Sequence, residues 1–313
     1  MSPQQTPDPL PVQDAIDRSR PPRMPPASLA IRLKTSRIPR KLVPTRLVVN
    51  RAERQAQALW QSSAAARARA IAVMQSILAG TARAHEVEEL APLHLIEAGV
   101  DRALFWQPWS ASMDGASSAL LRNAASEKRG VILSASHLGP HFCSLYALPP
   151  ELGRPYSVVG PWFLEPPSHD YWGRRLARWR KGALGHPVLS EGSYPTLMQV
   201  LSRGETVYLF FDLPGRRQTR LLGKQAMLAD GTARLAIEAD VPVLPLRARR
   251  IGHRAWVDVG SPLDPREYCG VKALHNSLAL VHERQILENP AAMTDPNSFG
   301  WDGGARAGSW KRP

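Results

Sequence analysis

Cysteine is scarce in this chain of 313 residues, which contains only Cys143 and Cys269, far apart in the sequence. No CxxC pair occurs, and no Cys/His cluster has the spacing of metal ligands, so the sequence predicts neither a zinc site nor a disulfide framework. Two isolated cysteines are typical of a reducing compartment. We therefore expect a cytoplasmic protein with no metal and no cofactor.

Long apolar runs are also lacking, because no segment approaches the ~20 apolar residues that cross a bilayer. Residues 1–30 carry eight prolines and no apolar core of a signal peptide. Since such a segment has little apolar surface to bury, we interpret it as a disordered tail. The sequence predicts a protein that is soluble or peripheral to a membrane.

Negative charge is in deficit, with 27 Asp and Glu against 40 Lys and Arg, a net charge of +13. A surplus of this size favours an anionic partner, such as a phospholipid surface, nucleic acid or an acidic carrier protein, although a solvated basic surface explains it as well. Residues 31–50 mix basic and apolar residues. This segment is either an amphipathic anchor at a membrane surface or a linker packed on the domain.

The remaining sequence predicts a helical part followed by alternating strands and helices. Residues 51–124 have apolar positions at helical spacing, and Gly80, Pro92, Gly99 and Pro108 are expected to divide them into several helices. From residue 129 on, short apolar runs alternate with helical patterns, which predicts an α/β fold with a mostly parallel central sheet flanked by helices. We expect strands at 130–136, 156–160, 187–190, 205–211, 241–246 and 255–259, and helices at 140–148, 170–183, 194–201, 231–239 and 272–287.

His137 is the best candidate for a catalytic residue, because it follows the first predicted strand directly and precedes Gly139 and Pro140. In open α/β sheets, ligands bind beyond the carboxyl ends of the strands. An imidazole at that place can act as a general base at neutral pH, and the amides of the next helix could stabilise an oxyanion. The alternative is a structural histidine that caps the helix. No GxSxG motif occurs, which argues against a serine hydrolase.

Several sequence blocks follow one another in a definite order. The first is the strand that His137 follows, and the second is an Arg-Gly pair, a strand and Asp212, followed by Leu213, Pro214 and Gly215. Further blocks are Leu222-Gly223-Lys224, the helix from Gly231, the strand 241–245 and the segment 286–290. In this order they resemble the blocks of the bacterial lipid A late acyltransferases and lysophospholipid acyltransferases of the glycerolipid acyltransferase superfamily. The resemblance implies that residues 51–292 form an acyltransferase-like domain, followed by an irregular tail over 293–313.

The chain departs from this family at the acid that should follow His137 after four intervening residues, because Phe142 stands there. Three explanations compete. A distal carboxylate replaces the acid, with Glu191 the first choice and Glu165, Asp170 and Asp212 behind it; or His137 works without one; or the protein binds ligand but has lost activity. His141, a second histidine in the same turn, is added to the catalytic candidates.

Basic clusters supply the predicted substrate-binding residues, since guanidinium groups bind phosphate through paired hydrogen bonds. One cluster lies on the predicted helix 170–183 and the other follows Asp212; a solvated helix face is the alternative. The predicted substrate-binding residues are Arg174, Arg175, Arg178, Lys181, Asp212, Arg216, Arg217 and Gly223.

These patterns together predict an acyltransferase, with His137 as general base. The expected donor is acyl-carrier protein or acyl-CoA, and the expected acceptor is the hydroxyl or amine of an anionic lipid or phosphorylated glycolipid. Peripheral contact with the inner face of the cytoplasmic membrane is expected, and no nucleic acid. The alternatives are a catalytically silent relative that binds lipid or a carrier protein, and a basic nucleic-acid-binding protein.

Overall fold

The computed structural model describes residues 41–160, Leu164, Arg174, Ala177, Arg178, Lys181 and residues 185–294. The predicted tail 1–30, the first ten residues of the basic segment, most of the predicted helix 170–183 and the residues after 294 lie outside these ranges. Among the described helices, none combines the length and the apolar composition that a bilayer crossing requires.

A seven-stranded sheet forms the centre of the fold, in the order β1-β9-β8-β2-β5-β3-β4. All neighbouring pairs are parallel except β8 and β9, which form an antiparallel hairpin at one side. The predicted mostly parallel α/β sheet is therefore confirmed. Its strands are β1 (Ser112–Met113), β2 (Val131–Ala135), β3 (Tyr156–Val159), β4 (His186–Leu189), β5 (Thr206–Phe210), β8 (Val243–Ile251) and β9 (Arg254–Val259).

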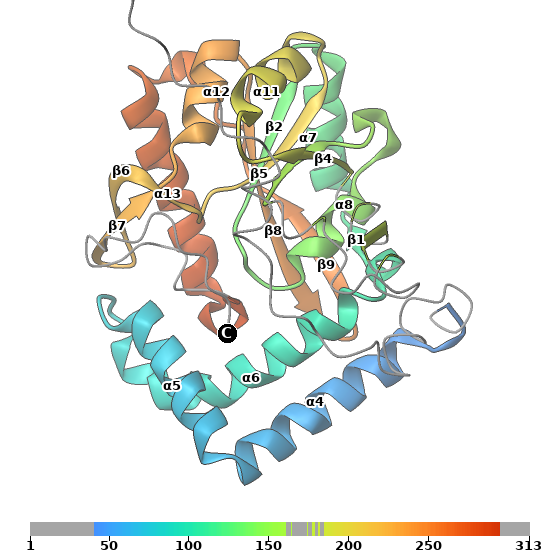
Figure 1. Ribbon diagram of the computed structural model, residues 1–313, viewed down its shortest axis with the longest axis vertical. Coiled ribbons are helices and arrows are strands. Elements are labelled where there is room, and N and C mark those ends of the chain that lie inside the picture. Colours follow the sequence, from blue (N-terminus) through green and yellow to red (C-terminus); the bar gives the residue numbers. More distant parts are fainter. Residues whose placement is uncertain are drawn as a thin grey trace, which may run out of the picture.

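Helices cover both faces of the sheet (Figure 1). On one face α11, α12 and α13 contribute Val200, Leu235 and Leu278 to the larger apolar core. On the other face Leu121 of α7 packs on Leu133 and Leu244. Strand β2 is buried at every position because it lies between these two layers. The covering helices are α7 (Gly115–Ser126), α8 (Ser144–Ala147), α11 (Ser193–Ser202), α12 (Gly231–Ala239) and α13 (Val271–Glu288).

The N-terminal part is helical, as predicted, and its helices lie together across one end of the sheet (Figure 1). Pro92 and Gly99 do not divide these helices, contrary to the expectation, since both lie inside α6. A Cβ at Gly99 would lie at ordinary contact distance, 3.5 Å from the backbone oxygen of Ala52 and 3.7 Å from the Cβ of Ala56, so α4 packs directly on α6 at this point. The three helices are α4 (Thr45–Ser62), α5 (Ala64–Leu78) and α6 (Val87–Leu104).

Arg250 of β8 forms ion pairs that connect two of these helices to the sheet. Its guanidinium pairs with Glu53 of α4 at 2.7 Å and with Glu97 of α6 at 2.8 Å. Because the arginine side chain is only 20% exposed, solvent screens these pairs less than pairs at an open surface. An apolar cluster that includes Val49, Leu104 and Cys143 supports the same junction.

A second sheet was not predicted from the sequence. Strands β6 (Pro214–Leu221) and β7 (Lys224–Leu228) form an antiparallel hairpin against α13. Its tight turn contains Leu222 and Gly223, both with positive φ. The run of polar and basic residues in β6 hid the strand, because only its inward positions Thr219 and Leu221 are buried.

Candidate active site

The two central parallel strands bring His137 and Asp212 together at their carboxyl ends. In the register of β2 with β5, Ala135 lies opposite Phe210. His137 follows Ala135 by two residues and Asp212 follows Phe210 by two, so the two side chains leave the sheet at the same level. The amide of Phe211 donates to the oxygen of Ala135 at 2.7 Å and continues the pairing past the strand ends. The position of His137 beyond a central strand is therefore as predicted.

Asp212 receives two hydrogen bonds from His137. The backbone amide of His137 lies 2.7 Å from Oδ2, and its ring nitrogen Nδ1 lies 2.9 Å from Oδ1. Burial alone would raise the pKa of Asp212, but attraction to His137 and these hydrogen bonds outweigh burial and hold that pKa below its usual value. Asp212 is therefore an ionised acceptor at neutral pH, so Nδ1 carries the ring proton that it donates.

This tautomer leaves Nε2 of His137 as the basic ring nitrogen. The ring stacks on Phe210, with 4.0 Å between centroids and 14° between planes. The His137 side chain is 21% exposed, whereas Asp212 is fully buried. A buried carboxylate that orients a partly exposed imidazole is the arrangement of a general base.

The C-terminal segment holds the backbone of the His137 turn from the other side. The oxygen of His137 accepts hydrogen bonds from the amide of Thr294 at 2.9 Å and from its hydroxyl at 2.8 Å. The amide of Gly139 donates to Ala292 at 2.8 Å, and Leu138 bridges to Met293. Both ends of the His137 peptide are thus fixed, one by Asp212 and the other by Thr294. Sequence reasoning missed Thr294.

The oxyanion site that the sequence suggested at the His137 turn stays a prediction, and three amides of this turn are already engaged elsewhere. The predicted helix 140–148 is only a 3-10 turn (His141–Cys143) followed by the four-residue α8. The amides of Leu138, Gly139 and His141 already donate to Ser136, Ala292 and Gly139. A tight turn replaces the helix here because Gly139, with φ of 58°, reverses the chain against the oxygen of Ala248.

His141 lies edge-on to His137, with 5.1 Å between ring centroids. It is buried, and its Nδ1 donates to the oxygen of Gly139 at 3.0 Å. Burial, and then the charge of His137, lower the pKa of His141 to about 3, so this ring is neutral at physiological pH. Its Nε2 is buried without a hydrogen-bond partner among the described residues. A catalytic role for His141 stays a prediction.

Asp101 of α6 is a further acid near this turn that sequence reasoning missed. Its Oδ1 is enclosed and has no hydrogen-bond partner among the described residues. Burial raises the pKa of Asp101 to about 7, while Arg102 and His137 act to lower it. Phe105, the residue directly after α6, packs edge-to-face on Phe142 at 5.1 Å. The residue at the position of the expected acid thus joins α6 to the His137 turn.

Glu191 is not the carboxylate that pairs with His137, and the first choice from the sequence is wrong on this point. Glu191 follows β4, which lies three strands from β2 and therefore ~14 Å away at the usual strand spacing. Asp212, a weaker candidate in the sequence, is the observed partner. Glu165 and Asp170 lie outside the described residues.

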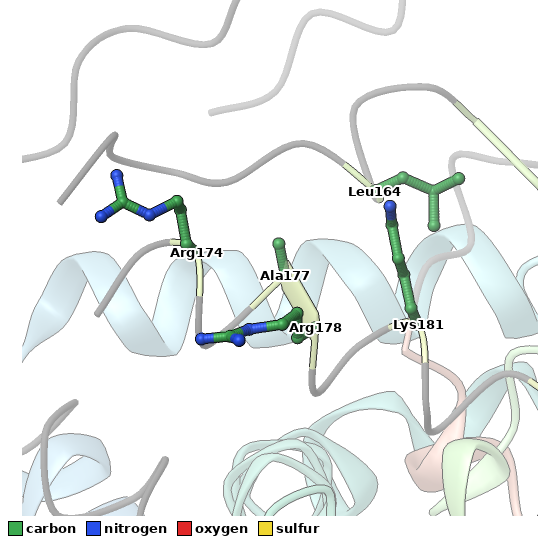
Figure 2. Close-up of a pocket in the computed structure, with 5 residues that line it drawn as sticks. All are labelled: Leu164, Arg174, Ala177, Arg178 and Lys181. Atoms are coloured by element: carbon green, nitrogen blue, oxygen red, sulfur yellow. The ribbon is translucent and has the colours of Figure 1, made fainter. Parts of the chain in front are cut away.

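The described residues of the first basic cluster line a hollow of about 330 Å³. Arg174, Arg178 and Lys181 share this lining with Leu164 and Ala177, and no acid is among the described lining residues. Figure 2 shows Arg174 and Lys181 extending to the side where Leu164 lies, with Arg178 extending along the segment. Arg175 lies outside the described residues.

The second basic cluster lies on the β6–β7 hairpin, and its arginines differ in their contacts. Arg217 pairs with Asp230 at 2.7 Å, whereas Arg216 is exposed. Gly223 has a structural reason for its identity: φ is 74°, and a Cβ there would overlap the backbone of Gly80. Binding of substrate by Arg216, Arg217 or Gly223 stays a prediction. Among the described residues, no three His, Cys, Asp or Glu side chains gather to hold a metal ion.

The chain is similar to solved structures but to no family model or curated protein. The structure of the 1-acyl-sn-glycerophosphate (LPA) acyltransferase PlsC from Thermotoga maritima is 16% identical, with a TM-score of 0.42. The match covers 82% of this chain and 100% of that chain. At this identity and superposition, the likeness assigns neither a family nor an activity.

Proposed function

We propose that the protein is an acyltransferase in which His137 is the general base. It moves a fatty acyl group from the thioester of acyl-carrier protein or acyl-CoA to the hydroxyl or amine of an anionic lipid or phosphorylated glycolipid. The observation that carries the proposal is the hydrogen bond between Nδ1 of His137 and Oδ1 of the buried Asp212. The sequence blocks that resemble lipid acyltransferases point to the same reaction.

In the proposed reaction, Nε2 of His137 accepts the proton of the acceptor hydroxyl while that oxygen attacks the thioester carbonyl carbon. The new C–O bond forms, and the carbonyl electrons move to oxygen in a tetrahedral intermediate. When the C–S bond breaks, the thiolate takes the proton back from the imidazolium, so no proton is gained or lost overall. Asp212 stabilises the imidazolium between these two steps and keeps its ionised form throughout.

The hollow that contains Arg174, Arg178 and Lys181 supports a phosphorylated substrate. Three cationic side chains with no acid among the described lining residues suit the phosphate of a lipid headgroup or of a phosphopantetheine arm. Leu164 and Ala177 in the same lining add apolar surface for the carbon chain next to a phosphate. We therefore assign substrate binding to this hollow as part of the proposal.

The exposed side of α4 supports the proposal that the protein is cytoplasmic and contacts the inner, anionic face of the cytoplasmic membrane. Arg51, Arg54 and Arg46 are exposed there together with Leu47 and Leu59, which are 51% and 44% exposed. Basic and apolar side chains on one helix surface favour an anionic bilayer. Binding to anionic vesicles that high salt abolishes would support this contact, and equal binding to neutral vesicles would contradict it.

The alternative of a catalytically silent protein that binds lipid or a carrier protein was based on the missing acid after His137. Asp212 supplies a carboxylate to the imidazole. No feature among the described residues favours nucleic acid over an anionic lipid.

The test is transfer of a radiolabelled palmitoyl group from acyl-carrier protein or coenzyme A to a panel of lysophospholipids, phosphorylated glycolipids and long-chain amines. His137→Ala is expected to lower kcat by about 10²–10⁴-fold, the range that general-base catalysis contributes. His253→Ala, an exposed histidine in the β8–β9 turn, is the matched control and should be unaffected. Unchanged transfer by His137→Ala would exclude the proposed base.

A further inference from the structure

His282 on α13 contacts the chain neighbours of both residues in the His137–Asp212 pair. The ring is fully buried. Its Nδ1 lies 3.0 Å from the hydroxyl of Ser136, and its Nε2 lies 2.9 Å from the hydroxyl of Ser134. It also stacks on Phe211, with 4.7 Å between centroids and 14° between planes. Ser136 directly precedes His137, and Phe211 directly precedes Asp212.

Ser134 of β2 and Ser136, the residue directly after β2, point to the same side because alternate residues of an extended chain do so. They are roughly 7 Å apart along the strand at the usual rise per residue. An imidazole whose two nitrogens lie on different edges of the ring can bridge hydroxyls at this spacing. His282 therefore fixes the last residues of β2 before the chain turns into His137.

The bridging ring is uncharged. Burial lowers the pKa of His282 to about 4, although Asp212 acts to raise it, so the ring is neutral at physiological pH. A neutral imidazole donates from one nitrogen and accepts at the other, so one serine accepts a hydrogen bond and the other donates one. Stacking on Phe211 needs no charge, and it ties the same ring to the end of β5.

We propose that His282 is a positioning residue that sets the separation and orientation of His137 and Asp212 through Ser136 and Phe211. It is assigned no contact with substrate. Only the expected change in kcat rests on the proposed acyl transfer. The geometry of the His137–Asp212 pair can be observed without turnover. A misplacement of about 1 Å in such a pair can cost 10²-fold in rate.

Two substitutions of His282 separate positioning from simple packing. The amide of Asn reaches the place of Nδ1 and can keep the bond to Ser136, whereas the longer Gln reaches the place of Nε2 and keeps the bond to Ser134. If His282 only fills space, His282→Gln should be the more active variant, because Gln fills more of the buried volume. If His282 positions the pair, His282→Asn should be the more active variant, because Ser136 is the residue next to His137.

The kinetic readout is kcat against KM for acyl transfer. We expect His282→Gln to lose on the order of 10²-fold in kcat with KM little changed, and His282→Asn to retain at least several-fold more activity despite a lower melting temperature. Ser136→Ala should resemble His282→Gln. Thr219→Val is the matched control: it removes a buried 2.7 Å bond between a hydroxyl and His275 on the same helix, and it should keep full kcat.

The second readout is the NMR signal of the His137 Nδ1 proton, which the bond to Asp212 should shift downfield. It is expected to shift or broaden in Ser136→Ala and His282→Gln and to be unchanged in Thr219→Val. If wild-type protein transfers no acyl group but the signal responds in this way, the proposed function fails and the positioning role holds. If Ser136→Ala and Thr219→Val give the same signal, or if His282→Gln is at least as active as His282→Asn, the positioning role is refuted.

Discussion

Replacing Asp212 by asparagine tests the centre of the site with almost no change in shape. Asp212 accepts the backbone amide of His137 at Oδ2 and the ring Nδ1 at Oδ1. In Asp212→Asn, the amide oxygen can still accept the backbone N–H. The NH₂ group then faces Nδ1 as a donor, so the ring must place its proton on Nε2. Nε2 is the nitrogen that has to accept the proton of the acceptor hydroxyl.

The expected effect follows from this change of tautomer. In serine proteases the equivalent substitution leaves the geometry intact and lowers kcat by about 10⁴-fold. We expect a fall on the order of 10³–10⁴-fold here, with KM little changed because the fully buried Asp212 does not reach substrate. A charged hydrogen bond contributes about 1.5–3 kcal/mol, but the amide also avoids burying a charge, so the protein should stay folded.

Initial rates of labelled acyl transfer give kcat and KM, and ¹⁵N shifts of His137 report its tautomer. Asp258→Asn is the control, because it alters a carboxylate that pairs with Arg249 at 2.5 Å on the β8–β9 hairpin, where no substrate-binding residue is predicted. Retention of more than about a tenth of wild-type kcat in Asp212→Asn, with the Nδ1–H tautomer replaced, would refute the proposed role of the pair.

Three further predictions concern stability and the His137 turn. Burial lowers the pKa of His141 to about 3 and of His275 and His282 to about 4, and raises that of Asp101 to about 7. Between about pH 6 and 5, the three histidines take up protons on unfolding and Asp101 releases one, so the free energy of unfolding should fall by roughly 2 kcal/mol for each pH unit of acidification. Urea titrations that give a flat free energy over this range would contradict it. Gly223→Ala should lower the melting temperature strongly because its Cβ overlaps Gly80, whereas Gly252→Ala, which also has positive φ but faces open space, should show only the backbone strain of about 1 kcal/mol; equal losses would exclude the overlap. Thr294→Val removes the 2.8 Å hydroxyl bond to the oxygen of His137 and should reduce kcat several-fold, about 1 kcal/mol, while Thr294→Ser should keep it; identical kinetics in the two variants would show that the hydroxyl has no role.

The sequence was sufficient for most of the elements because their signals are local. The run 130–136 contains β2 (Val131–Ala135), and the run 205–211 contains β5 (Thr206–Phe210). The predicted helix 231–239 matches α12 at both ends. His137 could be singled out because it directly follows such a run. Each of these inferences depends on residues that are close together in the chain.

Strand order is not a local property, and this is why the acid was misplaced. Asp212 and Glu191 both follow predicted strands, so the sequence could not rank them by distance from His137. Only the pairing of β2 with β5, with Ala135 opposite Phe210, brings Asp212 to the imidazole. His137 and Asp212 each follow the end of their strand by two positions, but Glu191 follows the end of β4 at the same spacing, so spacing does not rank the two acids.

Long-range contacts account for the other omissions. Thr294 lies 157 residues from His137, and His282 lies 146 residues from Ser136. His282 reads as an ordinary position in an amphipathic helix. At Pro92 the local signal predicted the end of a helix. The helix α6 continues through Pro92, and it packs against α4 and α5.

An acid that directly follows β5, instead of one in the turn after His137, changes what holds the pair together. With the acid five residues after the histidine, its position would depend on the conformation of one turn and the start of one helix. Here that helix is a single turn, and the acid is fixed by the register of two central strands. Strands in a buried sheet position side chains more precisely than loops do. Phe142 takes no part in the His137–Asp212 pair, and it packs on Phe105, the residue directly after α6. The orienting carboxylate therefore comes from the end of a central strand, while position 142 makes a contact with the N-terminal helices.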